Sequence, residues 1–533
     1  MKGAEVLLRV LARNGVHACF MNPGTSEMHF VSVLDAVPEM RPVLALFEGV
    51  ATGAADGYGR MTGRPAATLL HLGPGLANGI ANLHNARRAG TPLVNVVGDH
   101  ATYHKRFDAP LESDIASLAR PVSGWYRSTG RTATIARDAE EAVRAALGAP
   151  ACVATLVLPA DVSWLDADPA SIGARGGAGA AGPAAVPGTQ LAPPDEARLA
   201  AVARAIDSGA PAAIVLGGLS LGERGIAAAT RVAARTGAKL FAEPFPGRME
   251  RGAGVPPIER LGYFGEFVQA QLGDIAHLVL VGARAPVSPF AYPDKPSDLV
   301  PRGCEVRVLA GPSEDSAAAL EALADLLGAD ASAKAAAEEV FGSPPARPDP
   351  PSGPLNPHSF AAAIGAVLPE NAVISDEAIT SGFLLPGATA GAARHDLLTL
   401  SGNAIGQGLP LATGAAVACP DRPVLALEAD GSAMYTIQAL WTQAREGLDV
   451  TTVILDNGSY GILNIELGRV GAEAGGPVAR SMLDLSHPLT DFVALSESMG
   501  VPATRAHTAE DLTEALRRSF AEDGPHLVQA ILR

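Results

Sequence analysis

The fold is decided by the stretch PVLALEADGSAMYTIQALWTQAREGLDVTTVILDNGSYGIL, residues 423–463. Two apolar runs, VLALEA (424–429) and VTTVILD (450–456), have the composition of strands that are buried on both faces. Residues 435–446, between them, carry a helical pattern. This order predicts two parallel strands joined by a helix, and ligands of such sheets bind beyond the carboxyl ends of the strands.

Polar side chains follow both of these strands. Asp430 follows the first strand, and Asn457 follows the second, 27 residues later. Neighbouring parallel strands would bring a carboxylate and an amide oxygen together, and such ligands suit Mg²⁺, which shares its shell with phosphate oxygens and water. Gly431 and Ser432, at the helix start, offer backbone N–H groups to a diphosphate. Singly, these residues are better explained as a helix cap and a turn, but their joint spacing favours a metal–diphosphate site.

The same alternation continues along the whole chain. Strands are expected at residues 42–47, 66–72, 93–97, 212–217, 239–244, 278–283, 305–310, 371–376 and 526–532, and helices at 49–61 and 76–89. Two stretches rich in Gly, Ala and Pro, residues 168–194 and 342–354, have the composition of linkers. We therefore predict an α/β chain of three doubly wound parallel-sheet domains, 1–168, 195–341 and 355–533.

Composition excludes several classes of partner. The net charge of −16 and the absence of basic runs argue against nucleic acid and against an anionic membrane surface. No uncharged stretch reaches the roughly 18 apolar residues of a membrane span, and residues 6–11 fit an amphipathic helix better than a secretory signal. The four cysteines form no CxxC pair and are read as thiols in a reducing compartment, so we expect a cytoplasmic protein.

A lone carboxylate, Glu48, ends the strand at 42–47 and precedes the helix GVATGAADGYGRMTG. A charge at a helix start can simply be stabilised by the helix dipole. However, the pattern Glu48-x₇-Asp56-Gly57-Tyr58 and the stretch 428–463 together resemble the family of thiamine-diphosphate-dependent 2-oxo acid decarboxylases and acetolactate synthases. One departure is visible, because Ala429 stands where the family usually has the first Gly of Gly-Asp-Gly.

The resemblance implies the roles of these residues. Asp430, Asn457 and the backbone carbonyl of Ser459 would bind Mg²⁺, and Glu48 would hydrogen-bond the aminopyrimidine ring of thiamine diphosphate. Protonation of that ring nitrogen makes the 4′-imino form accessible, which then removes the C2 proton of the cofactor.

A third element, LTLSGNAIGQGLPLATGAA (398–416), resembles the family loop that bends thiamine into a V shape. Ile405 would be the wedge between the two rings, and carbonyls around residues 402–404 would accept from the 4′-amino group. Carried over, the cofactor-binding residues are Gly402, Asn403, Ile405, Gly431, Ser432, Tyr460, Gly461 and Ile462.

The resemblance covers essentially the whole chain, in the order pyrimidine-binding, middle and diphosphate-binding domain. It implies that each site lies across a subunit interface, with a homodimer as the minimum and a homotetramer as the usual form. Acetolactate synthases also bind FAD in the middle domain, but GARAPVSP (282–289) and LGYFGEF (261–267) stand in place of their flavin contacts. We therefore expect no FAD.

Residues that face the substrate are less clearly marked. His71 matches a catalytic histidine of benzoylformate decarboxylase, and Thr25, in NPGTSE, matches its active-site serine, although a lone histidine is more often a core residue. His100, His104, Lys105 and Arg106 lie in a loop, 98–114, and are candidates for binding a carboxylate; a solvated loop is the alternative. Ile462 and Ile465 would shape the substrate pocket.

Two reactions remain open from the sequence. Decarboxylation of a 2-oxo acid gives an enamine or carbanion, which is released as an aldehyde when protonated. The second catalytic histidine of benzoylformate decarboxylase has no counterpart, since Pro289 or Phe290 occupies its place. An acetolactate-synthase-type carboligation, in which the intermediate attacks a second carbonyl compound, is therefore the alternative.

Two other classes fit less well. HLGPGLANG (71–79) superficially resembles a dinucleotide-binding turn, but Asn78 falls at the third Gly position and only Asp99 could bind a ribose. An inactive regulatory paralogue is disfavoured because Glu48, Asp430 and Asn457 are all present.

Overall fold

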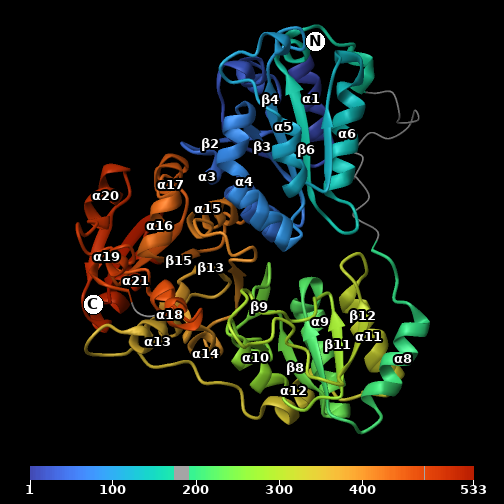
Figure 1. Ribbon diagram of the computed structural model, residues 1–533, viewed down its shortest axis with the longest axis vertical. Coiled ribbons are helices and arrows are strands. Elements are labelled where there is room, and N and C mark those ends of the chain that lie inside the picture. Colours follow the sequence, from blue (N-terminus) through green and yellow to red (C-terminus); the bar gives the residue numbers. More distant parts are fainter. Residues whose placement is uncertain (173–190, 473–474, 533) are drawn as a thin grey trace.

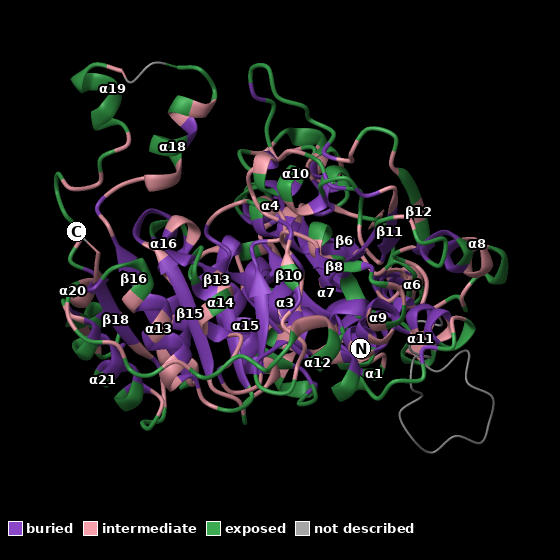
Figure 2. Ribbon diagram, turned by 90° about the horizontal axis from the view of Figure 1, so that it is seen from below, coloured by how far each residue is buried: buried purple, intermediate pink, exposed green. Residues whose placement is uncertain are grey.

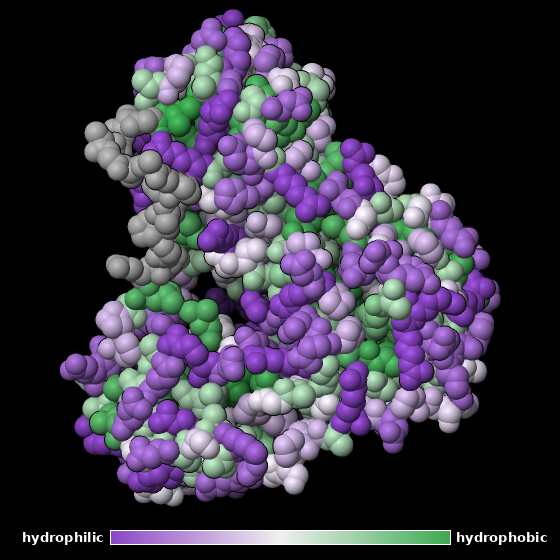
Figure 3. All heavy atoms as spheres, turned by 180° about the vertical axis from the view of Figure 1, so that it is seen from behind, coloured by the Kyte–Doolittle hydropathy of each residue, from purple (hydrophilic) through white to green (hydrophobic). Residues whose placement is uncertain are grey.

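The computed structural model describes residues 1–172, 191–472 and 475–532, so most of the expected linker 168–194 lies outside the described residues. Three β-sheets, each covered by helices on both faces, make up these residues (Figure 1). This confirms the predicted α/β class with three doubly wound, mainly parallel sheets. Seen from behind, the surface is hollowed where the upper part meets the two lower ones (Figure 3).

The first sheet is entirely parallel and has the order β2-β1-β3-β4-β6-β5. Its central strands are fully buried because both faces are covered, by α1 and α6 on one side and by α3 and α4 on the other. The elements are β1 (Ala18–Asn22), β2 (Arg41–Leu44), β3 (Ala66–Leu70), β4 (Leu93–Asp99), β5 (Trp125–Ser128), β6 (Val153–Pro159), α1 (Gly3–Arg13), α2 (Met28–Ser32), α3 (Glu48–Thr62), α4 (Leu72–Ala89), α5 (Ile115–Ala119), α6 (Ile135–Ala146) and α7 (Ala160–Trp164).

The second sheet has the order β10-β8-β7-β11-β12 and is also parallel. Helices α8, α9 and α11 pack on one face and α10 on the other. The elements are β7 (Ala212–Leu216), β8 (Lys239–Ala242), β10 (Glu259–Arg260), β11 (His277–Val281), β12 (Glu305–Ala310), α8 (Glu196–Ile206), α9 (Glu223–Thr236), α10 (Gly265–Leu272), α11 (Ser316–Leu326) and α12 (Ala333–Phe341).

The third sheet has the order β17-β18-β16-β15-β13-β14-β9. Its edge strand β9 (Met249–Arg251) comes from the middle of the chain and pairs antiparallel with β14 (His395–Thr399), which the sequence pattern did not indicate. The other elements are β13 (Ala372–Glu377), β15 (Val424–Ala429), β16 (Val450–Asp456), β17 (Ala503–Ala506), β18 (His526–Ile531), α13 (Pro357–Val367), α14 (Leu385–Thr389), α15 (Gly408–Ala418), α16 (Asp430–Thr436), α17 (Ala439–Glu446), α18 (Gly461–Arg469), α19 (Pro477–Ser481), α20 (Phe492–Ser498) and α21 (Ala509–Ser519).

One hydrophobic core joins the first and third sheets. Helix α3 packs against both α4 and α15, and the buried apolar residues of these helices form a single cluster with the strands on either side. Figure 2 shows this interior as continuously buried, with α18 and α19 standing out from it. The carboxyl ends of strands in both sheets are thus held in a fixed relation within one chain.

The helix after β15 differs from the expectation for residues 435–446. It begins at Asp430, directly at the strand end, and stops at Thr436 before α17 starts at Ala439. The early start follows from Asp430, whose side chain accepts the N–H of Gly431 at 2.9 Å. In the part of the chain that the structure describes, no helix has both the length and the apolarity to cross a membrane.

Candidate cofactor site

The two expected metal ligands lie at neighbouring strand ends. Ala429 of β15 pairs with Leu455 of β16, so Asp430 and Asn457 follow adjacent strands. The Asp430 carboxylate accepts the N–H of Gly458, the residue after Asn457, at 2.7 Å. The donor set fits Mg²⁺, because a carboxylate, an amide oxygen and a nearby backbone carbonyl are all hard oxygen ligands.

A cavity of about 290 Å³ adjoins these residues. Asp430, Gly431 and Tyr460 line it on one side, and residues 484–492 contribute most of the other. Gly431 is required by close packing, since a Cβ there would come within 2.4 Å of the Tyr460 ring. The cavity is large enough for a diphosphate group and lies where the sequence predicts one.

The neighbouring residues clarify the expected diphosphate contacts. Ala429 has φ −75° and ψ 147°, which any residue adopts, so the family's glycine is not needed for backbone conformation here. A Cβ on Gly461 would lie 3.2 Å from the hydroxyl of Thr380, a residue beside the site that the sequence analysis missed. Ser432 donates its hydroxyl to the carbonyl of Ala429 at 3.1 Å.

Glu48 is the first residue of α3, and only 7% of it is exposed. Its carboxylate accepts a hydrogen bond from the side-chain amide of Asn78 at 3.0 Å. Asn78 was noted in the sequence only as the residue that breaks the dinucleotide motif. The structure places it instead as the partner that orients Glu48.

The start of α3 and the loop 402–406 are joined within one chain. The amide of Asn82 donates to the carbonyls of both Gly49 (2.8 Å) and Gly406 (3.1 Å). Thr436, at the end of α16, also donates to Gly406, at 3.0 Å. Since α16 begins with Asp430, the residue after Glu48 and the helix that carries the metal ligand are linked through one loop carbonyl.

Most backbone groups of this loop have partners. His84 Nε2 lies 3.0 Å from the Gly402 carbonyl, and Asn85 binds both the N–H and the C=O of Ala404. The C=O of Asn403 and the N–H of Ile405 have no hydrogen-bond partner within residues 1–172, 191–472 and 475–532. The Asn403 carbonyl is an acceptor and the Ile405 amide, two residues later, is a donor. Such a pair fits the edge of an aminopyrimidine ring, whose amino group donates and whose ring nitrogen accepts.

A second cluster lies at the carboxyl end of the first sheet. His71, the residue before α4, places Nδ1 2.7 Å from Glu27 Oε2, and Glu27 also accepts the N–H of Gly24 at 2.8 Å. Burial raises the pKa of Glu27, and the neighbouring His71 opposes this rise. Sequence reasoning missed Glu27, although it belongs to the same NPGTSE segment as Thr25, whose own side chain is exposed.

The loop 98–114 carries the four residues that the sequence offered for binding a substrate carboxylate, and one of them is already paired. Lys105 forms ion pairs of 2.8 Å with both Asp99 and Glu112, so its charge is compensated. The rings of His100 and His104 are 5.3 Å apart. These two histidines therefore remain the candidates for an anionic substrate group, together with Arg106, which stacks on Phe107.

This loop also reaches the neighbourhood of His71. A Cβ on Gly73, in the first turn of α4, would overlap the hydroxyl of Ser113 at the far end of the loop. Tyr103 and Phe107 are 61% and 60% exposed at its tip. Ile465, the expected pocket residue on α18, is 43% exposed, whereas Ile462 is half-buried.

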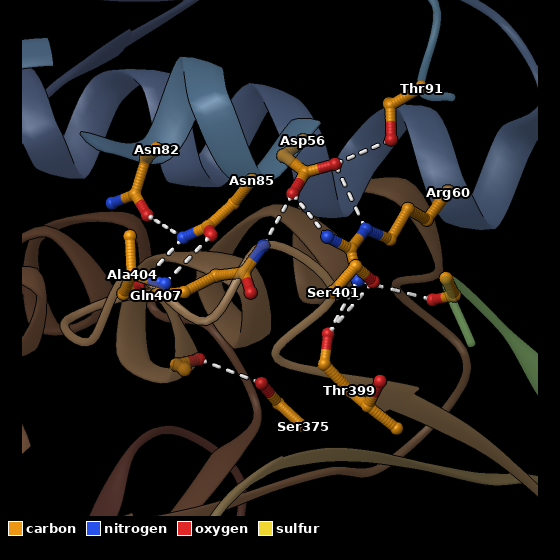
Figure 4. Close-up of polar contacts among 12 residues, drawn as sticks. Asp56, Arg60, Asn82, Asn85, Thr91, Ser375, Thr399, Ser401, Ala404 and Gln407 are labelled. Carbon is orange, nitrogen blue, oxygen red and sulfur yellow. Dashed lines mark hydrogen bonds and ion pairs between the residues drawn. The ribbon is translucent and has the colours of Figure 1, made fainter. Parts of the chain in front are cut away.

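The interface of the first and third domains contains a buried ion pair (Figure 4). Arg60 Nη2 lies 2.6 Å from Asp56 Oδ2, with 2% and 0% of the two side chains exposed. Thr91 and Gln407 also donate to Asp56, and Arg60 donates to the carbonyl of Thr399. Asp56, part of the family-like first-domain signature, therefore fixes the third-domain loop as well as its own helix.

In the middle sheet, the backbone segments that follow β7 and β11 approach each other closely. A Cβ on Gly217, after β7, would come within 2.8 Å of the Gly282 carbonyl, after β11. Glu243, at the end of β8, borders the same glycine. Burial raises the pKa of Glu243 to about 7, while Arg284 and Arg88 lower it.

Glu243 gives a pH-dependent contribution to stability. Its folded-state pKa of about 7 lies above the ordinary 4.5, so the folded state holds the proton longer, and the unfolding free energy falls as pH rises from about 5 to 7. We expect Glu243→Gln to reduce the change in unfolding free energy between pH 5 and pH 8 by about 2 kcal/mol. The effect stays at this size because the carboxyl is partly accessible to water. Denaturant unfolding of both proteins at pH 5 and pH 8 measures the effect; parallel slopes would contradict it.

Comparisons with known proteins agree with this geometry. The N-terminal TPP-binding domain of thiamine pyrophosphate enzymes matches residues 1–118, and the C-terminal TPP-binding domain matches residues 389–530. IlvX of Mycobacterium tuberculosis, provisionally named as an acetolactate synthase large subunit, is 57% identical over 100% of this chain and 99% of its own. Benzoylformate decarboxylase of Pseudomonas aeruginosa is 31% identical over 98% and 97%.

A solved structure gives the same result. The thiamine diphosphate-dependent 4-hydroxybenzoylformate decarboxylase of Rhodococcus jostii superposes with a TM-score of 0.83 at 25% identity, covering 100% of this chain and 99% of that one. Fold, site and relatives define an enzyme of the thiamine-diphosphate-binding α/β class. The chain belongs to the thiamine pyrophosphate enzyme family, whose cofactor is the same molecule under its other name.

Proposed function

We propose that this protein is a thiamine-diphosphate- and Mg²⁺-dependent enzyme that decarboxylates a 2-oxo acid and releases an aldehyde. The observation that carries the proposal is the pair of unpartnered backbone groups, the Asn403 carbonyl and the Ile405 amide, in a loop whose Gly406 carbonyl accepts from Thr436 of α16, the helix that begins at Asp430. When bound, thiamine diphosphate supplies an electron sink for the carbon that loses CO₂.

The third domain would hold the charged end of the cofactor. Asp430, Asn457 and the carbonyl of Ser459 would hold Mg²⁺, which when bound would supply positive charge next to the diphosphate. Gly431, in the first turn of α16, lines the same cavity, and Ser432 follows it at a helix start that favours negative charge.

The first domain would hold the pyrimidine end. Glu48 shares a proton with the ring nitrogen, and Asn78 fixes the carboxylate that does so. The third-domain loop would complete this end, with the Asn403 carbonyl as acceptor for the amino group, the Ile405 amide as donor to the ring, and the Ile405 side chain as the wedge between the two rings. Burial of Glu48 keeps bulk water from competing for that proton.

His71 would deliver the proton that turns the decarboxylated product into an aldehyde. Glu27 accepts from one ring nitrogen, which orients the imidazole and stabilises its protonated form. Thr25 and the histidines of loop 98–114 are the proposed contacts for the substrate carboxylate.

A carboligase is the second candidate. Pro289 and Phe290 offer no proton donor in the middle domain, and the 57% identical relative is named after acetolactate synthase. Without rapid protonation, a second carbonyl compound could capture the carbon nucleophile. We also propose a homodimer as the minimum assembly and a homotetramer as the usual one, supported by the exposed Tyr103 and Phe107. We propose no FAD, because GARAPVSP (282–289) and LGYFGEF (261–267) stand in place of the flavin contacts.

Cofactor titration tests the class of enzyme. We expect saturable binding of thiamine diphosphate that requires Mg²⁺, followed by circular dichroism, and at least about 100-fold weaker binding for Asp430→Ala, because a main metal ligand is lost. Asp195→Ala, which removes a helix cap in the middle domain, is the matched control and should bind normally. Binding by Asp430→Ala at wild-type affinity would contradict the metal assignment.

Product analysis then separates the two reactions. The loaded enzyme is incubated with benzoylformate, pyruvate and branched 2-oxo acids, and products are identified by mass spectrometry. Aldehyde and CO₂ in equal amounts support the decarboxylase, whereas an acyloin or acetohydroxy acid supports the carboligase.

A further inference from the structure

Asn85 is fully buried on α4 in the first domain, yet it contacts the cofactor loop of the third domain. Its Nδ2 donates to the carbonyl of Ala404 at 2.8 Å, and its Oδ1 accepts the N–H of Ala404 at 3.2 Å (Figure 4). Asn85 Nδ2 also donates to Oδ1 of Asn82, one turn earlier on α4, at 2.9 Å. The Asn85 side chain is therefore held from both directions.

The geometry of Ala404 fixes its neighbours. One side-chain amide reaches both the N–H and the C=O of Ala404, so these two groups point the same way, as they do in an extended residue. The preceding C=O and the following N–H of an extended residue point the opposite way. These are the carbonyl of Asn403 and the amide of Ile405, for which no partner is found among the described residues.

Glu377 holds the other end of the loop. It is buried at the end of β13 and accepts the N–H groups of Gly406 at 2.6 Å, Gln407 at 2.8 Å and Gly408. These bonds anchor the residues after Ile405 but do not touch Ala404. The orientation of the Asn403 carbonyl and the Ile405 amide, which together form the free edge of the loop, therefore depends on Asn85 and not on Glu377.

We propose that Asn85 is a positioning residue, which binds both backbone groups of Ala404 and thereby turns the Asn403 carbonyl and the Ile405 amide toward the pyrimidine ring of the cofactor. The inference rests on the proposed function. It assigns to the first domain a role in shaping the third-domain half of the site within the same chain.

The test compares two ligands of Asn85→Ala. Thiamine diphosphate contacts the free edge, whereas inorganic diphosphate with Mg²⁺ occupies only the charged end. Loss of two hydrogen bonds that orient the edge should weaken thiamine diphosphate binding about tenfold or more, with inorganic diphosphate affinity unchanged within about twofold. Amide hydrogen exchange at residues 404 and 405 of the cofactor-free protein should be faster than in wild type.

Asn95→Ala is the matched control. Asn95 is equally buried in the first domain and bonds to Thr68 and Thr155, far from the loop, so both ligands should bind this variant normally. If Asn85→Ala does not fold, Asn85→Asp keeps the acceptor for the Ala404 amide but faces the Ala404 carbonyl with a second acceptor, so it should also weaken thiamine diphosphate binding about tenfold or more.

The outcomes are distinct. Wild-type affinity for thiamine diphosphate in both Asn85 variants, or equal weakening of both ligands, would overturn the positioning role while leaving the enzyme class intact. Failure of the wild-type protein itself to bind thiamine diphosphate would overturn the proposed function and this inference together.

Discussion

Glu48→Gln should fold normally and bind cofactor, but turn over a 2-oxo acid about 10³-fold more slowly than the wild type. Glutamine can still accept the hydrogen bond from Asn78 at the position where Glu48 accepts it. It cannot share a proton with a ring nitrogen, and proton transfer by a positioned carboxyl contributes about 10²–10⁴ to such reactions. Steady-state turnover and deuterium exchange at C2 of bound thiamine diphosphate, followed by NMR, measure the loss.

A second buried carboxyl provides the control for this experiment. Glu243 follows β8 of the middle sheet and is none of the expected cofactor contacts, so Glu243→Gln should keep turnover within about twofold of wild type while altering stability. Exchange at C2 in Glu48→Gln as fast as in the wild type would remove Glu48 from the reaction.

Asp56→Ala should lower the unfolding free energy by about 3–5 kcal/mol, the range found when one partner of a buried ion pair is removed. The guanidinium of Arg60 would remain buried without its carboxylate, since 2% of that side chain is exposed. Thr91 and Gln407 would also lose their acceptor. Urea unfolding at pH 7 measures the change, and cofactor affinity should fall with it because Gln407 adjoins the cofactor loop.

An exposed ion pair shows what burial adds. Arg224 and Glu321 lie on the surface of the middle domain with 61% and 39% of their side chains accessible. Glu321→Ala should change the unfolding free energy by less than about 1 kcal/mol. If Asp56→Ala and Glu321→Ala lowered the unfolding free energy equally, burial would add nothing to the contribution of the Asp56–Arg60 pair to stability.

The parts of the site that could be predicted are those set by local order along the chain. Asp430 and Asn457 each follow an apolar strand, and these two strands are consecutive along the chain. Because consecutive strands joined by one helix pair in the sheet, the two residues lie at neighbouring strand ends. Glu48 was similarly marked by its place between a strand and a helix.

The residues that were missed depend on contacts between distant segments. Asn78 meets Glu48 across 30 residues, and Asn85 meets Ala404 across 319. Nothing in hydrophobic periodicity reports such a contact, because an asparagine that is buried by a partner has the same sequence signature as one that is solvated. Glu27 was hidden for the same reason, since its partner His71 lies on another strand end.

The fold showed a similar limit. Strand β9 has three residues, too few for any alternation to be recognised, and it joins a sheet whose other strands begin more than 120 positions later. The break between α16 and α17 arises where Thr436 turns to donate to the loop carbonyl of Gly406. Both features are consequences of tertiary contacts rather than of local preference.

Strand β9 also limits how this polypeptide can be divided. Its hydrogen bonds shield the outer side of β14, which would otherwise present unpaired N–H and C=O groups to other molecules. A fragment that starts at residue 355 would lack that cover and should self-associate edge to edge. We therefore expect the middle and last domains to be stable only when they are expressed together or transferred together into another protein.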